Sequence, residues 1–156
     1  MKKIILYITT LLLLLTKVGS SQVASIQTVE GTYGNTTVNV NLTGFTGANA
    51  IGAITLKIGF NPNVATYTGV SGGIITNGIY ANNPNGNEIV ISWAELTSAS
   101  VNGVAFSLNF NYTGGTSPLT FNQECDISNG NGINIQTTFN NGAITQPSLS
   151  TSATIA

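Results

Sequence analysis

Residues 54–60 have the sequence ITLKIGF, in which apolar residues alternate with polar or small ones without a break. The same alternation recurs in VNVNL at 38–42, in IVISW at 89–93 and in VAFSLNF at 104–110. A period of two residues is typical of antiparallel β-strands that bury one face. Weaker patterns predict further strands at 23–29, 64–70, 74–80, 119–125, 133–138 and 143–145.

Turn signals separate these segments. Six Asn-Gly dipeptides begin at positions 77, 85, 102, 129, 131 and 141, and Asn-Gly tolerates the positive φ angles that tight β-turns require. Beyond the first 20 residues, no segment keeps an apolar period of 3.6 residues. Nine or ten short strands in one domain predict an all-β fold with two sheets packed face to face and almost no helix.

The N-terminus has the pattern of a secretion signal. Met-Lys-Lys is followed by an apolar run at 4–15 and by the small residues Val18-Gly19-Ser20, which predicts a signal peptide over 1–21, cut after Ser20 or Ser21. The alternative is a membrane anchor, but the run of about 12 residues is shorter than the roughly 20 that span a bilayer. We therefore expect a secreted or cell-surface β-domain over 22–146, with a Ser/Thr-rich tail or linker at 147–156.

Charge excludes several functions. Only 6% of residues are charged and histidine is absent, which removes Ser-His-Asp and Cys-His catalysis and imidazole zinc sites. After residue 21, one base stands against five acids and leaves a net charge of −4, so a nucleic-acid partner is not expected. The base is Lys57, and the acids are Glu30, Glu88, Glu95, Glu124 and Asp126.

No catalytic, metal or cofactor site is expected. Glu88 and Glu95 are seven residues apart along one strand, or about 23 Å, which exceeds the distance of about 5–10 Å between the carboxyl groups of a glycosidase. Glu124 and Asp126 share a strand face by parity, where a solvated edge is the simpler interpretation. The loop at 82–88 lacks the aspartates of a calcium loop. The single mature cysteine, Cys125, is expected to be buried, and intermolecular pairing is the alternative.

Sugar binding needs exposed aromatic rings, so it matters which face of its strand each aromatic side chain occupies. Trp93, Phe60, Phe106 and Phe110 share the parity of their apolar neighbours and are expected in the core. The tyrosines remain as candidate surface rings, namely Tyr33, Tyr67, Tyr80 and Tyr112. They do not fall in a row on one strand, so a carbohydrate-binding module is kept as an alternative.

Four motifs, in order, resemble cohesin modules. They are FNPNV at 60–64, IVISWAE at 89–95, NGVAF at 102–106 and FNNGAI at 139–144. The resemblance covers roughly residues 25–145 and implies a nine-stranded jelly-roll sandwich, a fold shared with some carbohydrate-binding modules. Cohesins bind calcium-loaded dockerins and assemble polysaccharide-degrading complexes. The resemblance thus implies a non-catalytic docking function with calcium on the partner, and a passive structural or adhesin unit is a further alternative.

Outward parity and the resemblance together give a candidate partner-binding set: Ala53, Thr55, Lys57, Tyr80, Val90, Ser92 and Glu95. Small side chains on two strands would form a flat face if those strands are neighbours, as they are in cohesins. In that family the face uses polar residues on the first strand, a tyrosine and the acid after an aromatic-Ala pair. Tyr80 and Glu95 match the last two features. Ala53 and Thr55 depart from the family, because many cohesins have Asn or Asp there.

Overall fold

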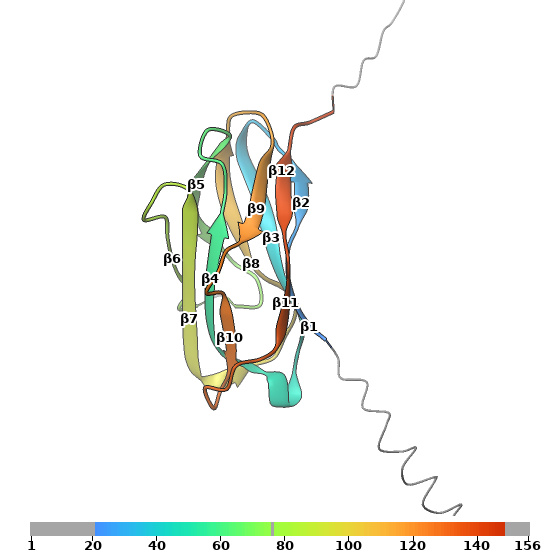
Figure 1. Cartoon of the computed structure of the whole chain (residues 1–156), viewed down its shortest axis with the longest axis vertical. Coiled ribbons are helices and arrows are strands. Elements are labelled where there is room, and N and C mark those ends of the chain that lie inside the picture. The colour runs from blue at the N-terminus through green and yellow to red at the C-terminus, as the bar shows by residue number, and fades with distance from the viewer. Residues whose placement is uncertain (1–20, 76, 149–156) are drawn as a thin grey trace, which may run out of the picture.

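The alternating segments form the two layers of a β-sandwich in the computed structural model, which describes residues 21–75 and 77–148 (Figure 1). The predicted signal peptide and most of the predicted tail lie outside these residues. The described residues form one short 3₁₀ turn, η1 (Gly47–Asn49), and twelve strand segments. These are β1 (Gln22–Ile26), β2 (Thr28–Glu30), β3 (Gly34–Phe45), β4 (Ile51–Gly59), β5 (Ala65–Ser71), β6 (Tyr80–Asn82), β7 (Glu88–Ala99), β8 (Val101–Tyr112), β9 (Ser117–Phe121), β10 (Asp126–Asn129), β11 (Thr137–Asn140) and β12 (Gly142–Thr145).

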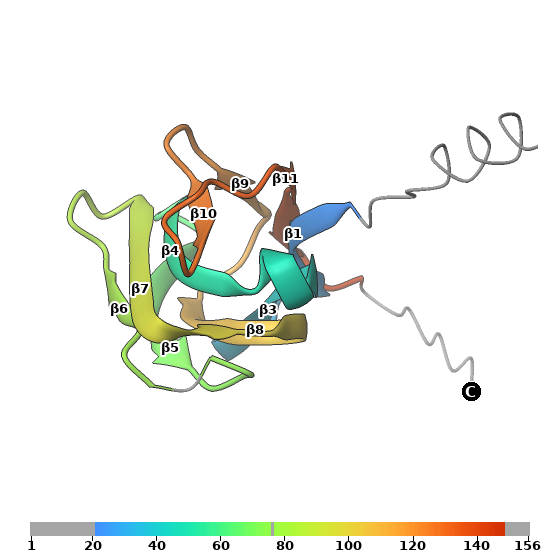
Figure 2. The same cartoon turned by 90° about the horizontal axis from the view of Figure 1, so that it is seen from below.

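The first sheet has the order β11-β1-β3-β8-β5, and the second has the order β2-β12-β9-β4-β7-β6, with β10 also paired to β4. Figure 2 shows the two layers from below, with β3, β8 and β5 in one layer and β4, β7 and β10 in the other. In the described part of the chain, no helix is long and apolar enough to cross a membrane. The predicted all-β sandwich is confirmed.

Strands that change sheet explain why there are more segments than the nine expected. The N-terminal strand divides into β1 in the first sheet and β2 in the second, and the C-terminal strand divides into β11 and β12 in the same way. The two crossings are close together, since a Cβ atom on Gly142 would lie 2.4 Å from the carbonyl oxygen of Ile26. Only glycine fits at that point, which gives the last Asn-Gly dipeptide a packing role.

The core lies between the sheets and contains the aromatic residues that parity placed there. Trp93 is 4% exposed, and its indole Nε1–H donates to the carbonyl oxygen of Asn77 at 3.0 Å. Phe60, Phe106 and Phe110 are also buried. The assignment of Tyr112 to the surface was wrong: the ring is 1% exposed, and its hydroxyl donates to the Gly115 carbonyl. A polar tip within reach of a backbone acceptor lets tyrosine enter a core.

Three weakly patterned strands differ from expectation. Residues 74 and 75 dock beside β8 through backbone N–H groups that donate to Val104 and Ala105, and the regular strand begins only at Tyr80. The segment predicted at 119–125 ends at Phe121, because Glu124 has a φ of 67°, which no β-strand accommodates. Of the segment expected at 133–138, only the part from Thr137 onward is a regular strand, and before it Asn134 forms an isolated bridge with Ser128.

Candidate functional site

The register of β4 and β7 builds a continuous outer surface. The two strands are antiparallel, with the pairs Ala53–Ala94, Thr55–Ser92 and Lys57–Val90. Directly opposed residues of an antiparallel pair project to the same side of the sheet. The intervening residues, such as Leu56 and Ile91, are fully buried, so this side faces solvent. The expectation that β4 and β7 are adjacent strands is therefore confirmed.

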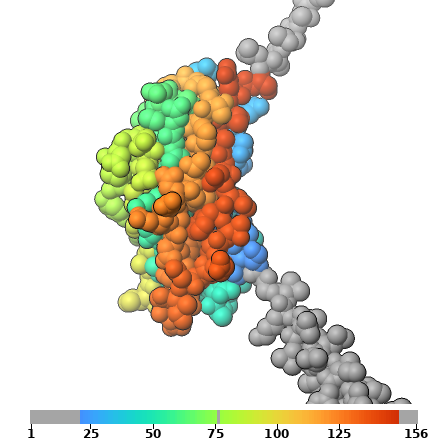
Figure 3. All heavy atoms as spheres, in the orientation of Figure 1, coloured from blue at the N-terminus to red at the C-terminus, as the bar shows by residue number. Residues whose placement is uncertain are grey.

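Two short strands widen this surface at its edges. On β6, Tyr80 pairs with Ser92 and Asn82 pairs with Val90. On β10, Asp126 pairs with Thr55 and Ser128 pairs with Ala53. In Figure 3 the segments of β6–β7, β4 and β9–β10 lie side by side on the side facing the viewer. We call this surface the β4–β7 face and define it as Ala53, Thr55, Lys57, Val90, Ser92, Ala94, Tyr80, Asn82, Asp126 and Ser128.

Six of the seven candidate residues belong to this face, and Glu95 does not. Glu95 has the inward parity of Trp93, and it lines a small hollow of about 80 Å³ with Ile74 and Asn77. The β4–β7 register also shifts just beyond the Ala53–Ala94 pair. The spacing in the sequence placed Glu95 at the margin of the face, but in the structure it adjoins Trp93 and the segment before β6, where the β4–β7 pairing is interrupted.

The face contains residues that the sequence did not reveal. Asp126 and Ser128 reach it only because β10 pairs with β4 across more than 70 residues of chain. The available signal was the alternation of 126–128 around Ile127, which is 1% exposed. Alternation predicts a strand but does not identify its neighbour.

A loop between β9 and β10 contributes the main electrostatic feature. Both strands run along β4, and residues 122–125 bridge them opposite Lys57. The backbone N–H of Asn122 donates to the Lys57 carbonyl at 2.8 Å, and the Lys57 N–H donates to Cys125 Sγ at 3.3 Å. Cys125 is thus half-buried rather than fully buried, and burial raises the pKa of its thiol.

The same loop neutralises Lys57. The Lys57 ammonium donates to the Glu124 carboxylate, and this hydrogen bond and the charge of Glu124 raise the pKa of Lys57. The same contact, reinforced by the charge of Lys57, lowers the pKa of Glu124. Glu124 therefore does not share a strand face with Asp126, contrary to the parity argument, because it lies in the loop and points to Lys57.

No arrangement for metal-dependent or two-carboxylate chemistry is found in the residues that the structure describes. In 21–75 and 77–148, no group of three or more His, Cys, Asp or Glu side chains could hold a metal ion. Glu88 and Glu95 line different hollows: Glu88 accepts a hydrogen bond from Asn122 at 2.6 Å, whereas Glu95 lies beside Trp93. The β4–β7 face offers hydrogen-bonding side chains, the exposed ring of Tyr80 and the carboxylate of Asp126, which is in no ion pair among the described residues.

Comparisons with known proteins agree on one family and one fold. Residues 23–145 match the protein-family model described as "Cohesin domain". The sixth cohesin of scaffoldin B from Acetivibrio cellulolyticus, solved in complex with a mutant Cel5 dockerin, has a TM-score of 0.75 at 21% identity, over 82% of this chain and 100% of that chain. The seventh ScaB type I cohesin from Pseudobacteroides cellulosolvens has a TM-score of 0.72 at 16% identity, over 87% and 98%.

A further similar structure comes from outside the bacteria. A non-cellulosomal cohesin from the hyperthermophilic archaeon Archaeoglobus fulgidus has a TM-score of 0.69 at 21% identity, over 84% of this chain and 94% of that chain. No curated protein sequence is significantly similar to the chain. At these identities the structural likeness establishes the fold.

Proposed function

The chain belongs to the cohesin domain family, and from this we propose that it is a secreted, non-catalytic module that docks a dockerin-type protein partner. The proposed setting is an extracellular polysaccharide-degrading or surface assembly. Support comes from similar structures that were solved as cohesin–dockerin complexes, among them one of a cohesin with a Cel5 dockerin. The predicted signal peptide supports the proposed location.

One observation carries the proposal: the two central strands of the β4–β7 face present mostly small side chains to solvent. Thr55, Ser92 and Ala94 occupy its centre, and directly opposed pairs hold them in register. Short side chains lose little conformational entropy when a partner covers them. Tyr80 is 62% exposed at the edge of this face and supplies the kind of aromatic anchor on which interfaces concentrate their energy.

Charge indicates what the partner presents. The only base of the face, Lys57, is already paired with Glu124. Asp126 makes no ion pair within the described residues, so the β10 side of the face has a negative charge free for a partner. Complementary charge chiefly sets the association rate and partner choice. We propose that the partner places a basic residue against Asp126, and that any calcium belongs to the partner and not to this chain.

The test is binding of residues 22–146 to a panel of purified dockerin modules, measured by calorimetry with calcium and then with chelator. Ser92→Arg places a long charged side chain at the centre of the face and is expected to abolish binding. Thr66→Arg is the matched control, since Thr66 is exposed on β5 in the other sheet. Equal binding by the two variants, with both folded, would mean that the partner uses a different surface.

The two alternative functions predict different results. A carbohydrate-binding module would be retained on insoluble polysaccharide. The described surface offers no row of aromatic rings for this, because its exposed rings are Tyr33, in the loop before β3, and Tyr80, on β6. A passive structural unit would bind neither dockerins nor polysaccharide.

A further inference from the structure

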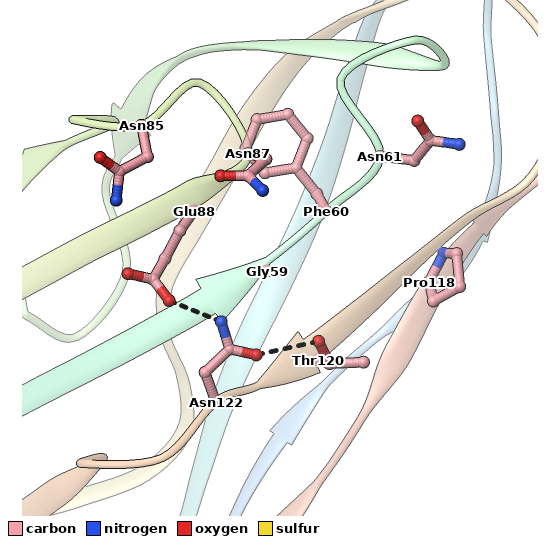
Figure 4. A pocket seen from close by; sticks show the side chains of 9 residues that line it. All are labelled: Gly59, Phe60, Asn61, Asn85, Asn87, Glu88, Pro118, Thr120 and Asn122. Atoms are coloured by element: carbon pink, nitrogen blue, oxygen red, sulfur yellow. Dashed lines mark hydrogen bonds between the residues drawn. The ribbon is translucent and has the colours of Figure 1, made fainter.

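A polar hollow of about 560 Å³ lies beside the end of the β4–β7 face (Figure 4). Three segments far apart in sequence line it: the end of β4 and the following turn at 59–61, the β6–β7 hairpin at 85–88, and β9 with the residue after it at 118–122. Its size lies within the range of roughly 300–1,000 Å³ that small-molecule sites occupy. It lies beyond the residues that define the β4–β7 face.

The floor of the hollow is bare backbone. Gly59 is not among the glycines with a positive φ, so its backbone conformation would also accept a residue with a side chain. A Cβ atom there would lie 3.1 Å from Thr120 Oγ1 and 3.2 Å from the side-chain amide of Asn122. Both distances are tighter than ordinary contact, so glycine keeps the space above these two side chains open.

The walls are organised by a chain of hydrogen bonds. Asn122 Nδ2 donates to Glu88 Oε2 at 2.6 Å, and Thr120 Oγ1 donates to Asn122 Oδ1 at 3.3 Å. Figure 4 shows these three side chains linked in a row along one side of the hollow. These hydrogen bonds orient the carboxylate and the amide before a ligand binds, so less side-chain entropy is lost on binding.

Opposite this row, two amides are free to bind. Among the described residues, the side chains of Asn85 and Asn87 have no hydrogen-bond partner, although both line the hollow. The chain is nevertheless anchored there, because the backbone N–H of Phe60 donates to the Asn87 carbonyl at 3.0 Å. Side-chain amides without protein partners are a ready set of donors and acceptors.

The composition of the lining selects the ligand class. The lining contains no Lys or Arg to pair with an anion, and a single carboxylate, Glu88, is a poor ligand set for a divalent cation, which prefers several. Amide groups both donate and accept, and so do sugar hydroxyls. Pro118 adds an exposed apolar ring at the rim. From these features we propose that the hollow binds a neutral saccharide through Asn85, Asn87, Glu88 and Asn122.

The test is a two-dimensional NMR titration of residues 22–146 with cellobiose, xylobiose and maltose, and separately with calcium chloride. At least one disaccharide is expected to shift the backbone amides of Gly59, Asn87 and Asn122. Asn87→Ala removes a side chain that has no hydrogen-bond partner among the described residues, and it is expected to weaken binding at least threefold. Gly59→Ala, which fills the floor, is expected to do the same.

Asn140→Ala is the matched control, since it removes an exposed asparagine on β11 and is expected to bind like the wild type. Ser92→Arg on the β4–β7 face is also expected to keep the saccharide shifts, which separates this site from partner docking. The proposal is overturned if calcium alone shifts these amides, if no disaccharide shifts them at millimolar concentrations, or if Asn87→Ala binds as well as Asn140→Ala.

Discussion

At the scale of single residues, Tyr80 is the clearest candidate for an energetic anchor. It is exposed, it lies on an edge strand, and its hydroxyl accepts a hydrogen bond from Asn82 at 3.0 Å that orients the ring. Tyr80→Ala is expected to weaken dockerin binding by more than about 1 kcal/mol in calorimetry while the melting temperature stays unchanged. Tyr33→Ala is the control, because Tyr33 is similarly exposed but precedes β3 of the first sheet and packs against Tyr112.

Two acids distinguish the face from its surroundings. Asp126 lies on the β4–β7 face, whereas Glu95 lines the hollow behind β7. Asp126→Lys is expected to lower the association rate constant for a dockerin, measured by surface plasmon resonance. The effect should be largest at low salt, because charges at the edge of an interface speed the diffusional encounter of the two proteins. Glu95→Lys introduces the same charge change off the face and is expected to bind like the wild type. The reverse outcome would restore the role that sequence spacing suggested for Glu95.

Trp93 tests the core beneath the face. Its ring is buried between the sheets, and the Nε1–H bond to Asn77 holds the loop that leads into β6. Trp93→Ala is expected to lower the free energy of unfolding by about 3–5 kcal/mol in urea denaturation. In the intact protein, Trp93 fluorescence should be blue-shifted and should resist iodide. Red, easily quenched emission would contradict the burial and place the ring at a ligand surface.

At the scale of elements, the β9–β10 loop makes part of the stability depend on pH. Lys57 lowers the pKa of Glu124 below its ordinary value of 4.5. A carboxyl whose pKa is lower in the folded state stabilises the fold above its unfolded pKa, and that stabilisation is lost as the pH falls through the folded value. Urea denaturation of Glu124→Gln is therefore expected to show a flatter pH profile than the wild type below about pH 4.5. Parallel profiles would mean that solvent fully screens the pair.

The elements also show which features the sequence could predict. Strong alternation identified β4, β7 and β8 and the buried positions of Ile54, Leu56 and Trp93, because burial of one face imposes the period directly. The ends of the weaker strands could not be found, because they depend on backbone conformations such as the positive φ of Glu124. Long-range pairing, which brings Asp126 beside Thr55, leaves no local trace.

At the scale of the whole molecule, two neighbouring regions present different chemical groups. The β4–β7 face offers small side chains and unpaired charge at its β10 edge, while the hollow at its end offers oriented amides around a glycine floor. The sheet register that fixes one also fixes the other, since the pair Gly59–Glu88 closes the β4–β7 ladder. Parity predicted the outward residues of the face, and the cohesin resemblance implied that their strands are neighbours. The hollow was not predicted, because its walls come from three segments that are far apart in the sequence.

The Asn-Gly turns that shape this fold also make it subject to chemical ageing. Such a pair deamidates when the Gly nitrogen attacks the Asn side-chain carbonyl, expels ammonia and leaves a ring that water opens to a carboxylate. Three of the asparagines are restrained by hydrogen bonds to their side-chain oxygens: Asn102, Asn129 and Asn141. For the pair that starts at Asn131, the Gly132 nitrogen itself donates to the Asn129 carbonyl.

Among the residues that the structure describes, Asn77 and Asn85 have no such side-chain hydrogen bond, although the Asn77 backbone carbonyl accepts from Trp93. Asn85 is followed by exposed Gly86 at the tip of the β6–β7 hairpin. Peptide mapping by mass spectrometry after storage in mildly alkaline buffer is expected to find the new carboxylate at Asn85 before Asn102, Asn129 or Asn141, and Gly86→Ala should delay it. Conversion at those three first would show that their hydrogen bonds give no protection. Each converted molecule would have a second negative charge at the hollow besides Glu88, so old and new protein would differ there while keeping the same β4–β7 face.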